Sequence, residues 1–245
     1  HETTVGATLA GVGEWEARQT AVLQGFLRPG DVAVDVGAHI GTHAVAFAHS
    51  VYPGGVVHAF EAQPAVFEVL ATNAHLAHTG NVLLHNSARA VNGSGFATVD
   101  NPTPGVLDDT LLECHGRSGD SAAWDHVPLI QLDDMEFTCP RVIKFDVEGM
   151  EEEALLGASR TIRDCHPVLH VENNRVAASR RLIELVSGMG YRLLWDVARF
   201  YDPENYFRVP TVTLPEAVSR NLEVPFSPNL LCLPPGFDVS TVEPQ

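Results

Sequence analysis

The chain has 245 residues, 45% of them hydrophobic, which is enough apolar material for one α/β domain or two small ones. Its 31 acidic residues outnumber its 15 Lys and Arg residues, so the formal net charge is −16. This charge disfavours binding to nucleic acids and to anionic membranes, since both need clustered Lys and Arg. We therefore expect a small-molecule partner, no nucleic acid and no membrane, and we also consider a homodimer.

The four cysteines at positions 114, 139, 165 and 232 show neither a C-x-x-C motif nor the spacing of metal ligands. We expect them to be buried, reduced thiols. No stretch approaches the roughly 18 apolar residues of a membrane span, and no signal peptide opens the chain. These features together predict a soluble, cytoplasmic protein.

The order of apolar and turn-forming stretches predicts one domain over residues 1–245. Strands alternate with helical patterns, which favours an α/β fold with a doubly wound, mostly parallel sheet and helices on both faces. We expect five parts: an N-terminal segment (1–12), an N-terminal helix (13–30), a core (31–233), an irregular or hairpin excursion within the core (about 92–126) and a Pro-rich tail (234–245).

The most informative stretch is residues 31–43, Asp-Val-Ala-Val-Asp-Val-Gly-Ala-His-Ile-Gly-Thr-His. Its alternating valines predict a buried strand, which ends at Gly37. Gly41 follows, and then an apolar helical pattern begins. A strand, a glycine turn and a helix let the backbone approach a ligand closely, because glycine has no Cβ. The turn lies at the carboxyl end of its strand, where open α/β sheets bind ligands.

A second predicted strand, residues 56–61, ends in Glu61, whose carboxylate can accept hydrogen bonds from both hydroxyls of a ribose. A dinucleotide would need G-x-G-x-x-G, whereas this turn reads Gly37-x-x-x-Gly41 and contains His39, which would crowd a diphosphate. S-adenosylmethionine has no phosphate. Asp35 suits its cationic end, and Glu61 suits its ribose. The residues therefore favour a methyl donor over NAD.

Later strand ends supply further polar groups that face the same crevice. Ser87 and Ala88 follow a third strand and are candidates for the adenine edge. A fourth strand ends at Asp146 and leads into Glu148, and a fifth ends at Glu172. With Glu61 at the end of the second strand, three strand ends thus carry acids, which is a strong signal of a binding site. The three glutamates that open the next helix (151–153) are expected to be solvated instead.

Five segments together resemble the FkbM family of S-adenosylmethionine-dependent methyltransferases, over roughly residues 12–233. The most distinctive part is the order Lys-x-Asp-x-Glu-Gly, which begins at Lys144. The segments are Asp35-Val-Gly-Ala-His-Ile-Gly-Thr-His, Glu61-Ala-Gln-Pro, Leu132-Asp-Asp, Ile143-Lys-Phe-Asp-Val-Glu-Gly-Met-Glu and His170-Val-Glu-Asn.

The resemblance implies a class I methyltransferase (Rossmann-like) sheet and O-methylation of a small-molecule hydroxyl, on a sugar or a natural product. It also implies roles for the residues that would bind the methyl donor. Asp35, on the central strand, is one of the candidate donor-binding residues. Gly37, Ala38, His39 and Gly41 would wrap the methionine part, Glu61 and Ala62 would hold the ribose, Ser87 and Ala88 would meet the adenine, and Asp146 would lie below the sulfonium.

For the acceptor, two mechanisms stay open. A general base would take the hydroxyl proton, and Glu148, Glu172 and His170 are the candidates. Alternatively, Asp146, Glu172 and Asn173 would hold Mg²⁺, which prefers oxygen ligands and would lower the pKa of the hydroxyl. Two other functions also stay open: an NAD-dependent oxidoreductase and a catalytically silent nucleoside-binding module.

Overall fold

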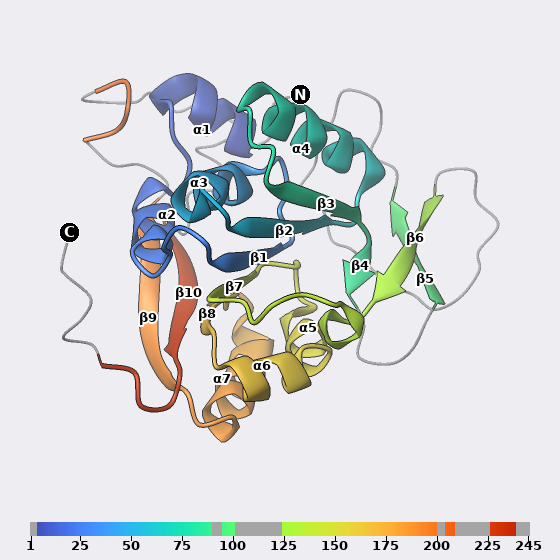
Figure 1. Ribbon diagram of the computed structural model, residues 1–245, viewed down its shortest axis with the longest axis vertical. Helices are drawn as coiled ribbons and strands as arrows, with labels where there is room; N and C mark the ends of the chain where they lie inside the picture. Colours follow the sequence, from blue (N-terminus) through green and yellow to red (C-terminus); the bar gives the residue numbers. More distant parts are fainter. Residues whose placement is uncertain (1–3, 90–94, 101–123, 200–203, 209–225, 239–245) are drawn as a thin grey trace.

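The computed structural model describes residues 4–89, 95–100, 124–199, 204–208 and 226–238. Its main feature is a seven-stranded sheet of order β3-β2-β1-β7-β8-β10-β9 (Figure 1). Neighbouring strands from β3 to β8 run parallel, and β10 runs antiparallel to both β8 and β9. The predicted doubly wound, mostly parallel sheet is confirmed.

From β1 onward, helices and strands follow the order expected from the sequence. The helices are α1 (Thr4–Val12), α2 (Ala17–Gln24), α3 (Thr42–Val51), α4 (Pro64–Leu76), α5 (Glu151–Leu156), α6 (Ser159–Cys165) and α7 (Val176–Gly188), with a 3₁₀ turn, η1 (Leu132–Asp134). The strands are β1 (Val32–Val36), β2 (Val56–Glu61), β3 (Val82–Asn86), β4 (Ala88–Arg89), β5 (Gly95–Asp100), β6 (Trp124–Ile130), β7 (Val142–Phe145), β8 (Val168–Glu172), β9 (Arg192–Arg199) and β10 (Phe226–Leu233).

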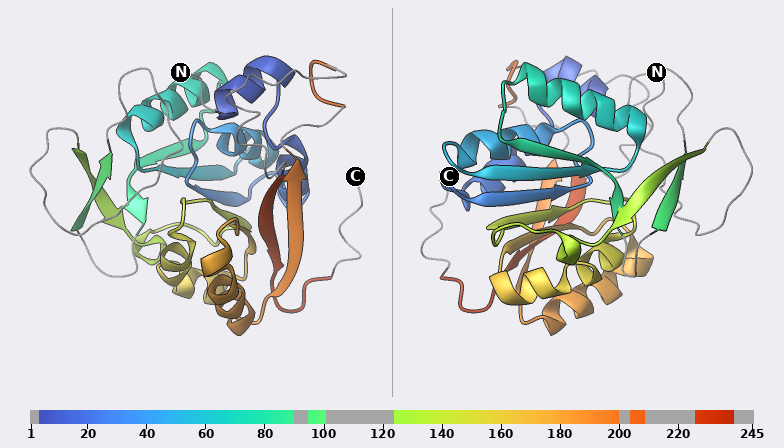
Figure 2. Two further views of the ribbon diagram at one scale, coloured as in Figure 1. Left: turned by 180° about the vertical axis from the view of Figure 1, so that it is seen from behind. Right: turned by 45° about the vertical axis from the view of Figure 1, so that its right-hand side comes forward.

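Each face of the large sheet has its own apolar core, because side chains alternate between the faces along each strand. Helices α2, α3 and α4 cover one face, and α5, α6 and α7 cover the other (Figures 1 and 2). The core under α2–α4 includes Leu23, Ala33, Phe47, Val57, Leu70 and Val142. The core under α5–α7 includes Val34, Ile143, Leu155, Ile162, Leu169 and Val186.

A small second sheet of order β4-β6-β5 stands at the edge of the molecule and projects from it in both views of Figure 2. Its β5 and β6 pair antiparallel, so the excursion predicted near residues 92–126 contains a hairpin-like pair. The structure does not describe residues 101–123 between them. Val127 of β6 is buried against Ala62 and Ala88, which fixes the small sheet beside the carboxyl end of β2.

Two boundaries at the N-terminus differ from the prediction. Residues 4–12 are helical rather than an unassigned segment, and the expected helix over 13–30 is confined to α2. Gly13 (φ 83°) and Glu16 (φ 47°) both have left-handed backbone conformations, which interrupt a right-handed helix. The interruption turns the chain so that Glu16 is carried toward the sheet.

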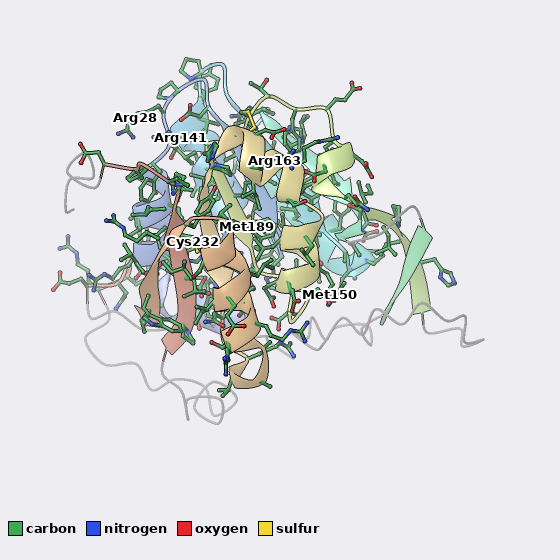
Figure 3. All side chains as sticks on the ribbon, turned by 90° about the horizontal axis from the view of Figure 1, so that it is seen from below. Arg28, Arg141, Met150, Arg163, Met189 and Cys232 are labelled. Carbon is green, nitrogen blue, oxygen red and sulfur yellow. A yellow bond between two sulfur atoms is a disulfide. The ribbon has the colours of Figure 1, made fainter. Side chains whose placement is uncertain are left out.

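The prediction of four reduced cysteines is wrong for Cys139 and Cys165, which form a disulfide. Cys139 lies just before β7, and Cys165, the last residue of α6, lies just before β8. Because β7 and β8 are parallel neighbours, their starting ends lie side by side and bring the two cysteines together. The sequence separation of 26 residues gives no sign of this contact. Cys232 is a buried free thiol on β10, near Met189 in Figure 3. Cys114 lies outside the described residues, and cysteine usage no longer supports a cytoplasmic location.

No helix in the described part of the chain combines the length and the apolar character that crossing a membrane requires. This agrees with the absence of a long apolar stretch in the sequence. The compartment in which the protein works remains a prediction.

The turn after β1 depends on Gly37 for a packing reason. Its backbone has φ 82°, and a Cβ there would overlap the carbonyl oxygen of Asp146 at the end of the neighbouring strand. Gly41 (φ 95°) opens α3, and a Cβ there would lie 2.6 Å from Leu70 Cδ1. Glycine is therefore needed at both ends of the turn even before any ligand is considered.

We predict that Gly37→Ala lowers the free energy of unfolding by about 3 kcal/mol or more, because it adds both steric overlap with backbone and a left-handed alanine. Urea denaturation measures the loss. Gly188→Ala is the control, since Gly188 closes α7 and its Cβ would meet nothing within 4 Å; it should be neutral or stabilise by up to about 1 kcal/mol. Equal stabilities for the two variants would contradict this account of the turn.

Candidate functional site

Polar side chains form a row across one face of the sheet, near the carboxyl ends of the strands. Asp35 on β1 is in register with Lys144 on β7, which is in register with His170 on β8. All three are buried. Since side chains on one face recur every second residue, these groups follow apolar residues of the α2–α4 core. Those apolar residues are Ala33, Val142 and Val168.

The Lys144 ammonium joins two acids. Its Nζ lies 2.9 Å from Asp146 Oδ2 and 3.6 Å from Asp35 Oδ1. Burial alone lowers the pKa of Lys144, but the charges of Asp146 and Asp35 outweigh it and raise the pKa above its ordinary value. Burial raises the pKa of Asp35 to about 6, whereas for Asp146 the nearby ammonium overcomes burial and lowers the pKa. Lys144 therefore stays protonated and holds the ends of β1 and β7 together.

Backbone N–H groups of the turn between β1 and α3 are already hydrogen-bonded within the protein, mostly to β2. Gly37 N and Ala38 N both donate to Phe60 O, at 2.9 and 2.8 Å, and Gly41 N donates to Ala38 O at 2.8 Å. His39 (φ 49°) donates its N–H to Glu61 Oε2 at 2.9 Å. A pyrophosphate needs such N–H groups to be available, so this turn does not form a dinucleotide cradle.

Glu61 sits at the carboxyl end of β2, beside that turn, and is 7% exposed. Its Oε1 accepts the N–H of Gln63 at 2.8 Å, while Oε2 accepts that of His39. Burial raises the pKa of Glu61 to about 7, and the backbone N–H groups partly oppose the rise. Each carboxylate oxygen has a second lone pair, so Glu61 retains the capacity to accept two hydroxyl hydrogens.

The third strand brings Ser87 and Ala88 next to this acid. Ser87 N donates to Glu61 O at 3.1 Å, and Asn86 Nδ2 donates to Glu61 O and to Ala62 O. Ser87 is buried, and its hydroxyl has no protein partner. The sequence-predicted donor residues of β1, β2 and β3 thus lie along one edge of the sheet.

Three carboxylates meet at the ends of β7 and β8. Asp146, Glu148 and Glu172 each offer an oxygen, and these oxygens lie within 4.8 Å of one another. Glu172 accepts Asn174 Nδ2 at 2.7 Å through Oε1, but its Oε2 is buried and has no hydrogen-bond partner. Burial, and then the charges of Asp146 and Glu148, raise the pKa of Glu172. Asn173, the amide predicted as a ligand, is buried beside this group and donates its N–H to Pro228 O.

Glu148 joins the carboxylates through a turn rather than through strand alternation. Strand β7 ends at Phe145, and Glu148 (φ 52°) is left-handed. Arg175 fixes this turn by donating to Glu148 O at 2.8 Å, and its guanidinium also lies 3.5 Å from Glu148 Oε2. Gly149 follows with φ 98°, and a Cβ there would meet the Arg175 guanidinium.

Glu151 corrects the expectation that the glutamates opening α5 are all solvated. It is 7% exposed, and its Oε1 accepts the N–H groups of Val147 and Gly149 at 3.2 and 2.9 Å. Burial raises its pKa. Glu151 is a structural brace for the turn, whereas Glu153 is exposed as predicted.

Further ionisable groups that the sequence reading missed lie around the polar row. Glu16 Oε2 is 3.9 Å from His43 Nε2, and both side chains are buried. Burial and then Asp146 raise the pKa of Glu16 to about 7, while burial and then Lys144 lower that of His43. His170 Nε2 lies 3.0 Å from Asp196 Oδ2 on β9, so this predicted base already has a partner. Glu16 lies just before α2, outside any motif, and His43 ends the 31–43 motif but was not assigned a role from it.

A groove of about 570 Å³ begins beside the carboxylates, between α7 and the starting end of β10. Asn173, Asn174 and the half-exposed Trp195 line it. It opens on the α7 side, adjacent to the polar row rather than within it. Its volume is in the range of pockets for small molecules.

The family comparison decides the class of protein. The model of the methyltransferase FkbM domain matches residues 35–193, which is more than half of the chain and spans every predicted site residue. The chain belongs to the FkbM family of methyltransferases. The resemblance inferred from the sequence motifs is confirmed.

Individual relatives agree with the family. The chain is 56% identical over 48 residues to 31-O-demethyl-FK506 methyltransferase FkbM of Streptomyces tacrolimicus, a stretch that covers 20% of this chain and 18% of that protein. FkbM from Methylobacillus flagellatus KT shares the fold with a TM-score of 0.52 and 16% identity, over 82% of this chain and 43% of that one.

Two further solved methyltransferases share the fold. Precorrin-6y C5,15-methyltransferase from Geobacter metallireducens GS-15 gives a TM-score of 0.56 at 15% identity, over 89% of this chain and 87% of that one. An O-methyltransferase from Bacillus cereus, solved in complex with SAH, gives a TM-score of 0.50 at 11% identity, over 89% of this chain and 80% of that one. These likenesses establish the class I methyltransferase fold for this chain.

We predict that Lys144→Met lowers the free energy of unfolding by about 3–5 kcal/mol at about pH 7.5, because Asp35 and Asp146 then lose their buried partner. The loss should shrink at about pH 5, where Asp35, whose pKa is already raised to about 6, is protonated. Urea denaturation at both pH values measures this. Arg180→Met removes an exposed pair with Glu184 and should cost less than about 0.5 kcal/mol. A small, pH-independent loss in Lys144→Met would refute the assigned role.

Proposed function

We propose that this FkbM-family protein transfers the methyl group of S-adenosylmethionine to a hydroxyl of a small molecule, on a sugar or a natural product. The observation that supports the proposal most is the position of Glu61. This buried acid stands at the end of β2, hydrogen-bonded to the glycine turn, where the ribose of a nucleoside would lie.

The remaining donor contacts would follow the sheet edge from β3 to β7. Ser87 and Ala88 would meet the adenine, and Glu61 with Ala62 the ribose. Gly37, Ala38, His39 and Gly41 would surround the methionine part. Asp35 and Asp146 would face its cationic end, and Lys144, which lies between these two acids, neutralises only part of their charge.

Methyl transfer is an in-line displacement, so its rate depends on aligning acceptor oxygen, methyl carbon and sulfur. As the oxygen attacks the methyl carbon, the carbon–sulfur bond breaks and the hydroxyl proton passes to a base. Glu172 and Glu148 are the proposed acceptors of that proton, and the raised pKa of Glu172 makes it a stronger base once ionised. His170 is the third candidate; Asp196 engages its Nε2, which leaves the buried Nδ1 as the atom that could take the proton.

The acceptor would enter beside these carboxylates. The groove lined by Asn173, Asn174 and Trp195 offers amide groups and an aromatic face, which suits the polar edges and the apolar faces of a sugar-like ring. The net charge of −16 favours neutral or cationic acceptors over phosphorylated ones.

The function is tested with S-adenosylmethionine carrying a ¹³C-labelled methyl group and a panel of sugars, polyketide alcohols and amines. We expect label in a methyl ether, identified by NMR, and calorimetric binding of S-adenosylhomocysteine but not of NAD. Label appearing only on nitrogen would contradict O-methylation. Binding of NAD in preference to S-adenosylhomocysteine would contradict the proposed donor.

We predict that Glu61→Ala weakens S-adenosylhomocysteine binding about 10- to 150-fold, because a charged acceptor for two hydroxyls is worth roughly 1.5–3 kcal/mol. Glu68→Ala on the exposed face of α4 is the control and should bind like the wild type. Calorimetry measures both, with circular dichroism to check folding.

The same residue should impose a pH dependence on donor binding. The pKa of Glu61 is about 7 in the free protein, and hydroxyl donors favour the ionised carboxylate. Wild-type affinity should therefore rise with pH up to about 7, because below that value binding must expel a proton, and then level off. Glu61→Ala should lack this rise. A flat profile in the wild type would show that Glu61 does not face the ligand.

A further inference from the structure

We infer that Asp146, Glu148 and Glu172 form a binding site for a divalent cation that prefers oxygen ligands, a site that includes Glu148. The inference deepens the proposed function, because the cation would lie where the acceptor hydroxyl enters. It rests on the geometry of the three carboxylates, on one buried oxygen without a partner and on the local balance of charge.

The geometry matches the size of such an ion. The three ligand oxygens lie within 4.8 Å of one another. Oxygens on opposite sides of Ca²⁺ are about 4.6–5.2 Å apart, and those around Mg²⁺ about 4.2 Å apart at most. The three oxygens are therefore close enough to surround one divalent ion, with less closure needed around Ca²⁺ than around Mg²⁺ or Mn²⁺. Two ligands come from one turn and the third from the neighbouring strand, β8.

Glu172 provides the second, independent observation. Its side chain belongs to a residue that is only 9% exposed, and its Oε2 has no hydrogen-bond partner. A buried oxygen of this kind is costly unless a partner compensates it. The other oxygen, Oε1, accepts Asn174 Nδ2, and this hydrogen bond helps to orient the carboxylate. A cation between the three acids would supply the missing partner.

The local charges leave room for a cation. Lys144 is 2.9 Å from Asp146 and is shared with Asp35, so it does not neutralise both acids. Arg175 is 3.5 Å from Glu148, on the partly exposed side. Four carboxylates (Asp35, Asp146, Glu148 and Glu172) thus face two cationic side chains, which leaves a formal charge of −2 when all are ionised. One divalent ion would neutralise this charge.

A cation here would coordinate the acceptor oxygen and lower the pKa of its hydroxyl, which reduces the need for a strong protein base. Glu148 and Glu172 would then act as ligands instead of proton acceptors. Lys144 would keep one oxygen of Asp146 oriented, leaving the other for the ion. Cation binding by these residues would therefore replace the protein base described above.

The experiment uses Mn²⁺ as the probe, because its electron paramagnetic resonance signal distinguishes free from bound ion. We expect the full chain to bind one Mn²⁺ that Mg²⁺ or Ca²⁺ displaces. Glu148→Gln and Glu172→Gln should each weaken Mn²⁺ binding at least about tenfold. Glu153→Gln is the matched control; it removes the same charge from an exposed position five residues from Glu148 and should leave affinity unchanged.

Two results would overturn the inference: no stoichiometric binding at millimolar Mn²⁺, or equal weakening in Glu153→Gln, which would indicate diffuse surface charge. Circular dichroism checks folding, and the partly exposed Glu148 carries the test if the buried Glu172 variant fails to fold. S-adenosylhomocysteine binding, measured separately, keeps the questions apart. Donor binding without Mn²⁺ binding refutes only the cation site, whereas Mn²⁺ binding without donor binding refutes only the proposed donor.

Discussion

The ion pairs of Lys144 with Asp35 and Asp146 are the interaction on which the site depends. They join the ends of two adjacent parallel strands at the point where Gly37 lets the backbones come together. A buried ammonium is tolerated only because both acids hold it, and the acids are tolerated only because of the ammonium. This mutual dependence fixes the glycine turn relative to the end of β7, and so fixes the proposed donor side of the site relative to the proposed acceptor side.

The two-residue period of the strands extends this arrangement across the sheet. On the face under α2–α4, each central strand runs from apolar to polar toward its carboxyl end: Val57 to Glu61, Val142 to Lys144 and Asp146, and Val168 to His170 and Glu172. The apolar part anchors the helices, and the polar part is left at the ligand-binding edge. The side chains on this one face of the sheet therefore form both the apolar core and the polar site.

Much of this was predictable because strands and their ends have clear local signals. Asp35, Glu61, Asp146 and Glu172 were placed from strand patterns, and the motifs around them identified the FkbM family. Other features depend on long-range contacts or on left-handed residues, which lack such signals. Glu148 was predicted as a site residue, but not the left-handed turn (φ 52°) that brings it to the other carboxylates. Glu16 arrives through an interrupted helix, and Cys139 meets Cys165 only because parallel strands start side by side. The sequence pattern indicates that Gly37 lets the backbone approach a ligand, whereas strand packing already requires glycine at this position.

The central claim is that the polar edge of the sheet holds a methyl donor with its sulfur facing Asp146 and its ribose facing Glu61. A crystal structure of the complex with S-adenosylhomocysteine tests this most directly. The account predicts both ribose hydroxyls within hydrogen-bond distance of the Glu61 carboxylate, and the sulfur on the side of the turn where Asp146, Glu148 and Glu172 meet. A ligand bound elsewhere, or one whose ribose avoids Glu61, would contradict it.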